Sequence, residues 1–287
     1  MSNQKRPVSI CFPARKGGVG KTTLTINMAA FLANDGNRVL VVGADDQQDA
    51  ADLWLASSDS YDAENHKSFA GVLKGEYPPE EAVYTTAPLR KVEYKKNLLG
   101  HVSRKWLGSQ TYTFDIMPAG EELFSAVDAS NERLLYDRFD NGFSQKYDYI
   151  LFDIPTAWYD TTTLVYMYVM YAFIPLTDNA SYKSSIMTMN EITSVQAMGY
   201  PIKCLGFIIN MADGRDGSLG QYLAGSFREA YGDYVLPHTI RFSKTVWNAS
   251  AFSIPLASYN KAPVLDDMYE VYRDICERIE EDRKENS

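Results

Sequence analysis

The sequence contains few cysteines and no closely spaced pair of them. Its three cysteines, Cys11, Cys204 and Cys276, lie far apart along the chain. A disulfide framework or a cysteine-ligated metal site normally shows as paired cysteines at short spacing, so neither kind of site is indicated. We expect all three thiols to be reduced residues of the core.

Long apolar runs are also scarce. The longest run, at residues 164–176, is too short to span a bilayer, and the opening residues MSNQKRPVSICF do not place a long apolar segment behind a basic flank. These absences predict a cytoplasmic protein that makes no contact with a membrane.

Positive charge is not in excess. The net charge is −9 and the isoelectric point is near 4.9. Because polyanion binding depends on clustered Lys and Arg that release counterions from phosphates, this balance argues against a general nucleic-acid coat. Any contact with DNA must therefore be made by a local patch.

No internal repeat, low-complexity tract or linker divides the 287 residues, so we expect a single domain over residues 1–287. Short apolar runs alternate with helical stretches, which is typical of an α/β fold with a mostly parallel, twisted sheet and helices on both faces. The predicted strands lie at residues 8–12, 38–42, 149–152, 173–176 and 205–209.

Helical periodicity is clear in several segments. In residues 21–35 it places Leu24, Met28, Phe31 and Leu32 on one face before Gly36 ends the helix. In residues 164–171, LVYMYVMY, the aromatic residues and Met are predicted to fill a core rather than to stack on a cofactor.

A C-terminal packing helix is predicted at about residues 265–282. Apolar residues recur there at helical spacing beneath an acidic outer face; they are Met268, Val271, Tyr272, Ile275 and Ile279. A helix lying on a membrane surface would instead be rich in Lys and Arg on its polar face.

A glycine-rich turn, KGGVGKT at residues 16–22, stands between the first strand and the first helix. Glycines there let backbone N–H groups point at phosphate oxygens, and the helix N-terminus favours negative charge. Lys21 is expected to neutralise the β- and γ-phosphates of ATP, and the Thr22 hydroxyl to coordinate Mg²⁺. The predicted nucleotide-binding residues are Gly17, Gly18, Val19, Gly20, Lys21, Thr22 and Thr23. The usual pattern GxxxxGK[ST] fails at its first glycine, where Arg15 stands.

The turn KGGVGKT instead matches the deviant Walker A loop, and the chain resembles the ParA/Soj family of DNA-partition ATPases over most of its length. This resemblance implies a P-loop NTPase fold. It also implies that Lys16 is a signature lysine, which in the family reaches across an ATP-sandwich homodimer to the phosphates held by the other subunit. Lys16 is therefore a candidate catalytic residue together with Lys21.

Two acidic segments follow predicted strands and resemble further family motifs. VLVVGADDQQD, at residues 39–49, resembles the switch motif, in which Asp45 matches the aspartate that orients the attacking water and contacts magnesium through water. Gly43 replaces the family's first aspartate, and Asp49 is a possible substitute for it. KYDYILFDIP, at residues 146–155, resembles the Walker B strand, which implies that Asp153 holds Mg²⁺ through water. Thr156 stands where many relatives have a second proline.

The C-terminal half carries further likeness to the family. GFIINMADGR, at residues 206–215, resembles the strand and loop with an adenine-contacting asparagine, which suggests Asn210 near the base; a cap or turn residue is the alternative. The family binds DNA without sequence preference through surface basic residues of this half. The available ones are Arg215, Arg228, Arg241 and Lys244.

Residues 89–110 depart from the family pattern and are locally basic. Six basic residues, Arg90, Lys91, Lys95, Lys96, Arg104 and Lys105, stand against a single acid, Glu93. We interpret this insertion as a solvated helical hairpin, and a DNA or partner surface is the alternative.

The function that the resemblance implies is partition of plasmid or chromosomal DNA. The expected protein dimerises on ATP and binds nonspecific DNA of the nucleoid. It hydrolyses ATP slowly until a centromere-binding, ParB-like partner stimulates it. The alternatives are an ATPase of the same class that positions another cargo or regulates division, and a metabolic ligase or reductase with the same loop.

Overall fold

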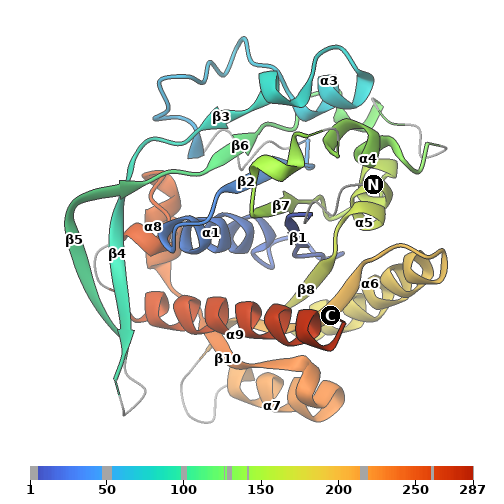
Figure 1. Cartoon of the computed structure of the whole chain (residues 1–287). Coiled ribbons are helices and arrows are strands. Elements are labelled where there is room, and N and C mark those ends of the chain that lie inside the picture. The colour runs from blue at the N-terminus through green and yellow to red at the C-terminus, as the bar shows by residue number, and fades with distance from the viewer. Residues whose placement is uncertain are drawn as a thin grey trace.

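The core of the fold is an eight-stranded sheet with the order β10-β9-β8-β1-β7-β2-β6-β3 (Figure 1). The computed structural model describes residues 6–46, 54–97, 102–125, 127, 131–140, 142–213, 219–259 and 262–286. Every neighbouring pair in the sheet is parallel except that of β3 with β6. The strands are β1 (Val8–Cys11), β2 (Val39–Gly43), β3 (Tyr84–Thr85), β6 (Asp115–Met117), β7 (Tyr149–Asp153), β8 (Tyr171–Leu176), β9 (Lys203–Ala212) and β10 (Val235–Arg241).

The central strands are apolar along their whole length because helices cover both of their faces. All residues of β1, β2 and β8 are buried. Side chains alternate between the faces, so Ile10 lies in one hydrophobic cluster and Cys11 in the other. The five strands predicted from sequence are confirmed, and β9 extends beyond its predicted bounds at both ends.

Two helical layers enclose the sheet (Figure 1). The cluster on one face is formed with α1 (Lys21–Asn34), α8 (Lys244–Ala251) and α9 (Pro263–Glu285). On the other face lie α3 (Phe69–Lys74), α4 (Leu134–Phe139), α5 (Asp160–Tyr168), α6 (Asn179–Ala197) and α7 (Leu219–Tyr231). Short 3-10 turns are η1 (Pro79–Ala82), η2 (Leu123–Ser125), η3 (Ser144–Lys146), η4 (Gly232–Tyr234) and η5 (Leu256–Ser258). The predicted α/β fold class is confirmed.

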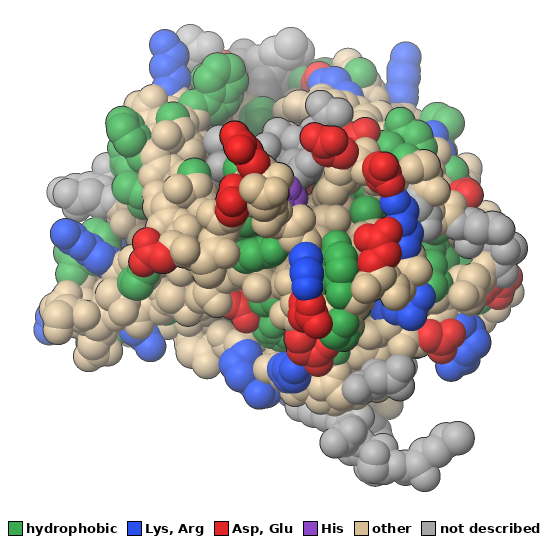
Figure 2. Space-filling model, turned by 90° about the horizontal axis from the view of Figure 1, so that it is seen from above, with side chains coloured by type: hydrophobic (Ala, Val, Ile, Leu, Met, Phe, Trp, Pro, Cys, Tyr) green, Lys and Arg blue, Asp and Glu red, His purple; other side chains and the backbone are tan. Residues whose placement is uncertain are grey.

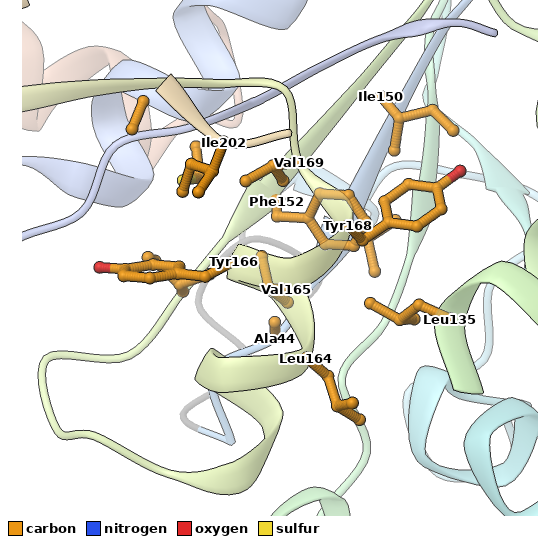
Figure 3. Close-up of a cluster of buried hydrophobic side chains, with 14 of the residues drawn as sticks. Ala44, Leu135, Ile150, Phe152, Leu164, Val165, Tyr166, Tyr168, Val169 and Ile202 are labelled. Carbon is orange, nitrogen blue, oxygen red and sulfur yellow. The ribbon is translucent and has the colours of Figure 1, made fainter. Parts of the chain in front are cut away.

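Helix α5 carries the tyrosine-rich stretch, and its side chains fill the core (Figure 3). Val165 and Tyr168 are fully buried, and Tyr166 is nearly so. The Tyr168 ring packs edge-on against Phe152 of β7, with centroids 5.8 Å apart. The prediction of core packing is confirmed.

Helix α1 is more deeply buried than the one apolar face predicted from its periodicity. Every residue from Leu24 to Asn34 is buried, so the helix is enclosed on all sides rather than on one face. Two buried asparagines on α1 hold neighbouring segments by hydrogen bonds. Asn27 Oδ1 accepts from Leu256 N at 2.7 Å, and Asn34 bonds both the N–H and the C=O of Val92 at 2.8 Å.

The insertion is a β-hairpin, and our prediction of a helical hairpin is wrong. Strand β4 (Leu89–Lys96) pairs antiparallel with β5 (Val102–Tyr112). Its inner face packs on the α9 side, where the Tyr94 ring stacks on Tyr269 at 4.4 Å and Tyr94 donates to Ala257 O. These aromatic contacts, together with the Asn34 amide, favour the extended chain over a helix.

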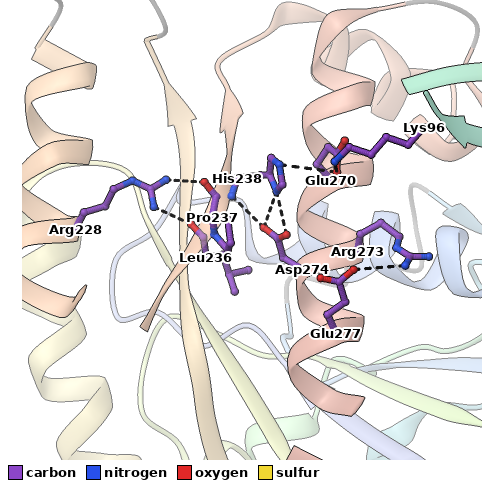
Figure 4. Close-up of polar contacts among 9 residues, drawn as sticks. All are labelled: Lys96, Arg228, Leu236, Pro237, His238, Glu270, Arg273, Asp274 and Glu277. Carbon is purple, nitrogen blue, oxygen red and sulfur yellow. Dashed lines mark hydrogen bonds and ion pairs between the residues drawn. The ribbon is translucent and has the colours of Figure 1, made fainter. Parts of the chain in front are cut away.

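Ion pairs join the hairpin and β10 to the acidic C-terminal helix, whose prediction is confirmed (Figure 4). Lys96 bonds Glu270 at 2.9 Å, and the Asp274 carboxylate accepts from the backbone N–H of His238 at 3.0 Å. The ring of His238 also lies 3.0 Å from Asp274. The acidic face of α9 thus binds neighbouring elements of the same chain.

The cysteines are free thiols; Cys11 is buried, and Cys204 and Cys276 are partly exposed. Burial raises the pKa of Cys204 to about 12, so this thiol is protonated at neutral pH. None of the helices in the described ranges is long and apolar enough to cross a membrane.

Replacing Asn34 by alanine tests the docking of the hairpin. The change leaves the buried N–H and C=O of Val92 without their amide partner, so we expect the free energy of unfolding to fall by about 2–4 kcal/mol. Urea denaturation measures it. Asn248→Ala, at an exposed position of α8, is the control and should change stability by less than about 0.5 kcal/mol. Equal effects of both variants would contradict a structural role for the Asn34 amide.

Candidate functional site

The site lies at the carboxyl ends of three adjacent parallel strands. Strand β7 lies between β1 and β2, with Cys11 beside Phe152 and Gly43 beside Asp153. The Ala44 N–H donates to the carbonyl oxygen of Asp153 at 2.7 Å. Loops after neighbouring parallel strands emerge at the same edge, so the glycine-rich loop, Asp45 and Asp153 all lie at this edge of the sheet.

The glycine-rich loop has the shape of an anion site. Gly18 and Gly20 have φ angles of 74° and 91°, which favour glycine. Gly17 and Gly18 are exposed with open space beside them, whereas Val19 is fully buried and anchors the loop. Helix α1 starts at Lys21 with no acidic residue in its first turn, so its N-terminal amides are available to a negative ligand.

Lys21 points from the start of α1 toward the segment after β7. Its ammonium donates to the Thr156 hydroxyl at 2.8 Å. Thr22 and Thr23 follow in the first turn and are half-buried. The lysine and both threonines thus belong to the first turn of α1, directly after the loop.

Lys16 and Arg15, at the beginning of the loop, bind acidic residues of α6. The Lys16 ammonium forms an ion pair with Asp178, the residue that caps α6 by accepting from Ser181 N. Arg15 pairs with Glu191. Partial burial works against ionisation of Asp178, but hydrogen bonds from Lys16 and Ser181 outweigh it and hold the pKa of this carboxyl below its usual value. This anion therefore stays charged at neutral pH.

Asp153 and Asp45 supply the acidic part of the site. Asp153 is 2% exposed at the end of β7, and Asp45 is half-buried after β2. Gly43 lies against β6, where a Cβ atom would be 3.0 Å from Ala119 N, so an aspartate at this position would crowd the neighbouring strand. Asp46 is half-buried nearby, and Asp49 lies outside the described residues.

Asn210, near the end of β9, lies against the glycine-rich loop. Its side chain is buried and donates to the carbonyl oxygen of Val19 at 2.8 Å. It also borders a cavity of about 260 Å³ whose walls include Thr23, Met211, Phe242 and Trp247. Asn210 is thus a strand residue beside the loop rather than a helix cap.

Two of the basic residues proposed for DNA are engaged in contacts within the chain. Arg228 donates to the carbonyl oxygens of Leu236 and Pro237, and Arg241 makes a bidentate ion pair with Asp267 (Figure 4 shows Arg228). Lys244 is exposed at the start of α8, and Arg215 lies outside the described residues. On the face shown in Figure 2, Lys and Arg side chains are interspersed with Asp and Glu.

A larger cavity lies away from the loop. It has a volume of about 890 Å³ and is lined by α3, the segment before it and the turn after β6, with His66, Lys74 and Glu121 among the lining residues. None of its lining residues belongs to the glycine-rich loop or to the ends of β1, β2 and β7. This cavity is therefore separate from the sheet edge that carries the loop.

Sequence reasoning missed the partners of the loop cations. We did not predict that Lys16 pairs with Asp178, that Arg15 pairs with Glu191 or that Lys21 bonds Thr156. Contacts between residues more than a hundred positions apart leave no local pattern in the sequence. One signal was present for Asp178: a polar residue directly after a buried strand, followed three residues later by Ser181, is typical of a helix N-cap.

Comparison with known proteins identifies the family of the chain. The model of the AAA domain family matches residues 8–196. The chain is 27% identical to the chromosome partitioning protein ParA of Caulobacter vibrioides over 254 residues, which cover 86% of this chain and 85% of that protein. It is 26% identical to the chromosome-partitioning ATPase Soj of Thermus thermophilus, with 94% of each covered.

Among solved structures, an ATP complex of McdA from Cyanothece has a similar fold. The TM-score is 0.73 at 18% identity, and the match covers 94% of this chain and 96% of that one. At this identity the likeness concerns the fold.

Replacing Gly20 by alanine tests the loop conformation. Its φ of 91° disfavours any side chain, and a Cβ atom would lie 2.6 Å from the Asn210 amide nitrogen. We expect thermal or urea unfolding to show a loss of about 1–3 kcal/mol. Gly17→Ala enters open space and should change stability by less than about 0.5 kcal/mol. If both variants were equally stable, the loop would not have the described shape.

Proposed function

Because the chain belongs to the AAA domain family and is a ParA/Soj-like ATPase within it, we propose that it is a DNA-partition ATPase driven by MgATP. The observation that carries the proposal is the pair of lysines on one glycine-rich loop. Lys21 opens α1 and faces the end of β7, whereas Lys16 lies at the far end of the loop. One cation serves the subunit's own nucleotide and the other is available to a second subunit.

The loop residues fit a triphosphate. Amides of Gly17, Gly18, Val19 and Gly20 and the N-terminus of α1 hold the phosphates, and Lys21 neutralises the β- and γ-phosphates. Magnesium, when bound with the nucleotide, shields the phosphate charge during transfer. It would take the Thr22 hydroxyl as a direct ligand and Asp153 through water. The described ranges hold no group of three His, Cys, Asp or Glu residues that could bind a metal by itself, which suits an ion held mainly by phosphates and water.

Asp45 completes the hydrolytic site. It follows β2, next to the end of β7, and its carboxylate orients the water that attacks the γ-phosphorus, with ADP as the leaving group. Gly43 leaves no carboxylate at the neighbouring family position. We therefore assign the principal catalytic role in this chain to Asp45.

Dimerisation on ATP follows from Lys16. Within one subunit its ammonium already has an anionic partner, Asp178. When Lys16 reaches the phosphates bound by a second subunit, it leaves the Asp178 carboxylate and pairs with a more highly charged anion. This exchange of partners is favoured only while a triphosphate is present. The nucleotide thus controls formation of the homodimer.

The cavity beside Asn210 suits the adenine base. It adjoins Thr23 of the first helical turn, and its walls offer the amide of Asn210 and the rings of Phe242 and Trp247. Aromatic faces stack on bases, and an amide can hydrogen-bond to a base edge. We assign the base to this cavity, with the phosphates on the loop.

The dimer binds nonspecific DNA in the cytoplasm, on the nucleoid, and a centromere-binding, ParB-like partner stimulates its slow hydrolysis. Among the described basic residues, those that suit DNA are Lys244 on α8 and three lysines on the outer face of the β4–β5 hairpin, Lys91, Lys95 and Lys105. Arg228 and Arg241 are instead held in contacts within the chain. Such a surface is small, which is consistent with the net charge of −9.

Two lysine variants separate nucleotide binding from dimerisation. Lys21→Ala should abolish detectable ATP binding by calorimetry. Lys16→Ala should keep nucleotide binding but lose the ATP-dependent shift from monomer to dimer in light scattering, together with ATP-dependent binding to duplex DNA. A Lys16→Ala protein that still dimerises on ATP, or a wild type that binds DNA equally well without nucleotide, would contradict the proposal.

A tryptophan variant tests the base site. Trp247 is 72% exposed and borders the cavity. Because ATP and ADP both carry adenine, Trp247→Ala should lower the affinity for each of them by about tenfold. Inorganic tripolyphosphate, which has no base, should bind as before. Phe252→Ala, at a ring that is 71% exposed and does not border the cavity, is the matched control. Unchanged affinity of the tryptophan variant for both nucleotides would place the base elsewhere.

A further inference from the structure

The hydroxyl of Thr156 lies beside the phosphate-binding lysine. Lys21 Nζ donates to Thr156 Oγ1 at 2.8 Å, although the two residues are 135 positions apart in the sequence. Thr156 is three residues beyond Asp153 and follows the buried Pro155.

The segment that carries Thr156 is fixed on both sides. The Arg15 guanidinium lies 5.4 Å from the Trp158 ring centroid, and Trp158 packs edge-on against Tyr166 of α5 at 5.3 Å. Tyr159 stacks on Phe124 of η2 with centroids 3.8 Å apart. These contacts hold the backbone on the C-terminal side of Thr156, and β7 holds it on the N-terminal side. The position of the hydroxyl is therefore set by the fold and not by Lys21 alone.

The Lys21 ammonium can donate hydrogen bonds both to the Thr156 hydroxyl and to a phosphate, so it fixes how far apart the two lie. Two oxygens that accept from one ammonium at about 2.8–2.9 Å lie roughly 4.7 Å apart. A change of the Thr156 χ1 rotamer moves its oxygen by roughly 2.4 Å, which can close the remaining gap. A hydrogen bond between Thr156 and a phosphate oxygen bound to Lys21 is therefore within reach of a single rotamer change.

The relevant phosphate is the terminal one. Loop amides and the start of α1 surround the α- and β-phosphates, whereas the γ-phosphate extends toward the ends of β7 and β2. Thr156 comes from the end of β7, on the same side as Asp153 and Asp45. A diphosphate leaves this space to water.

We propose that Thr156 is a specificity-determining residue that distinguishes ATP from ADP by a hydrogen bond to the γ-phosphate. With a vacant loop or with ADP, the hydroxyl accepts from Lys21. With ATP, Lys21 turns its donors to the phosphates, and the Thr156 hydroxyl donates its proton to a γ-phosphate oxygen, a charge-assisted bond that ADP cannot make. The inference rests on the proposed function, since it requires that the loop binds adenine nucleotides.

The test compares Thr156→Val, Thr156→Ser and wild type in calorimetric titrations with ATPγS and ADP in the presence of Mg²⁺. Valine keeps the branched shape without the hydroxyl. The Thr156→Val variant should therefore bind ATPγS with about tenfold lower affinity, and its affinity for ADP should fall by less than about twofold. Serine should restore the wild-type ratio of affinities. Thr111→Val, at an exposed position of β5, should leave both affinities unchanged.

Three outcomes would overturn the inference: equal weakening of both nucleotides, which indicates a general effect on the loop; no change in either; or tighter binding of both, which indicates that Thr156 merely competes for Lys21. Failure of the wild-type protein to bind either nucleotide would instead contradict the proposed function. Thermal unfolding of each variant without nucleotide confirms that it is folded.

Discussion

The organisation of the site depends on the parallel pairing of β1, β7 and β2. This pairing brings together three segments that are far apart in the sequence: the glycine-rich loop, Asp45 and Asp153. The loop can present its amides because Val19 is buried beneath it and because Gly18 and Gly20 adopt positive φ angles. The register of Gly43 beside Asp153 places the ends of β2 and β7, and the carboxylates that follow them or lie there, at the same edge as the loop.

The features that could be predicted from sequence were those with a local pattern. Buried parallel strands are apolar runs, and the phosphate loop is a contiguous motif, so the strands and the position of the loop were found correctly. The C-terminal helix was found because its apolar residues recur at helical spacing above an acidic face. Burial of α1 on all sides was not predicted, because the small and polar residues of this helix suggest an exposed face that the hairpin and η5 in fact cover.

The features that could not be predicted depend on contacts between distant segments. Residues 89–110 are dominated by charge and suggested a solvated helix, yet Asn34 and Tyr269, both far away in sequence, stabilise an extended hairpin there. Likewise, nothing local to Lys16 or Lys21 identifies Asp178 or Thr156 as their partners. The loop motif specifies which groups bind phosphate, and the surrounding fold decides what those groups contact when it is vacant.

The two asparagines of α1 connect the site to distant parts of the molecule. The N-terminus of this helix belongs to the phosphate loop, and its last residue, Asn34, holds the basic hairpin through both polar groups of Val92. Fourteen residues of helix make a rod roughly 21 Å long. From Leu24 to Asn34 this rod is buried on every side, so its packing restrains it from bending. One continuous helix thereby spans the distance from the phosphate loop to a hairpin that carries positive charge.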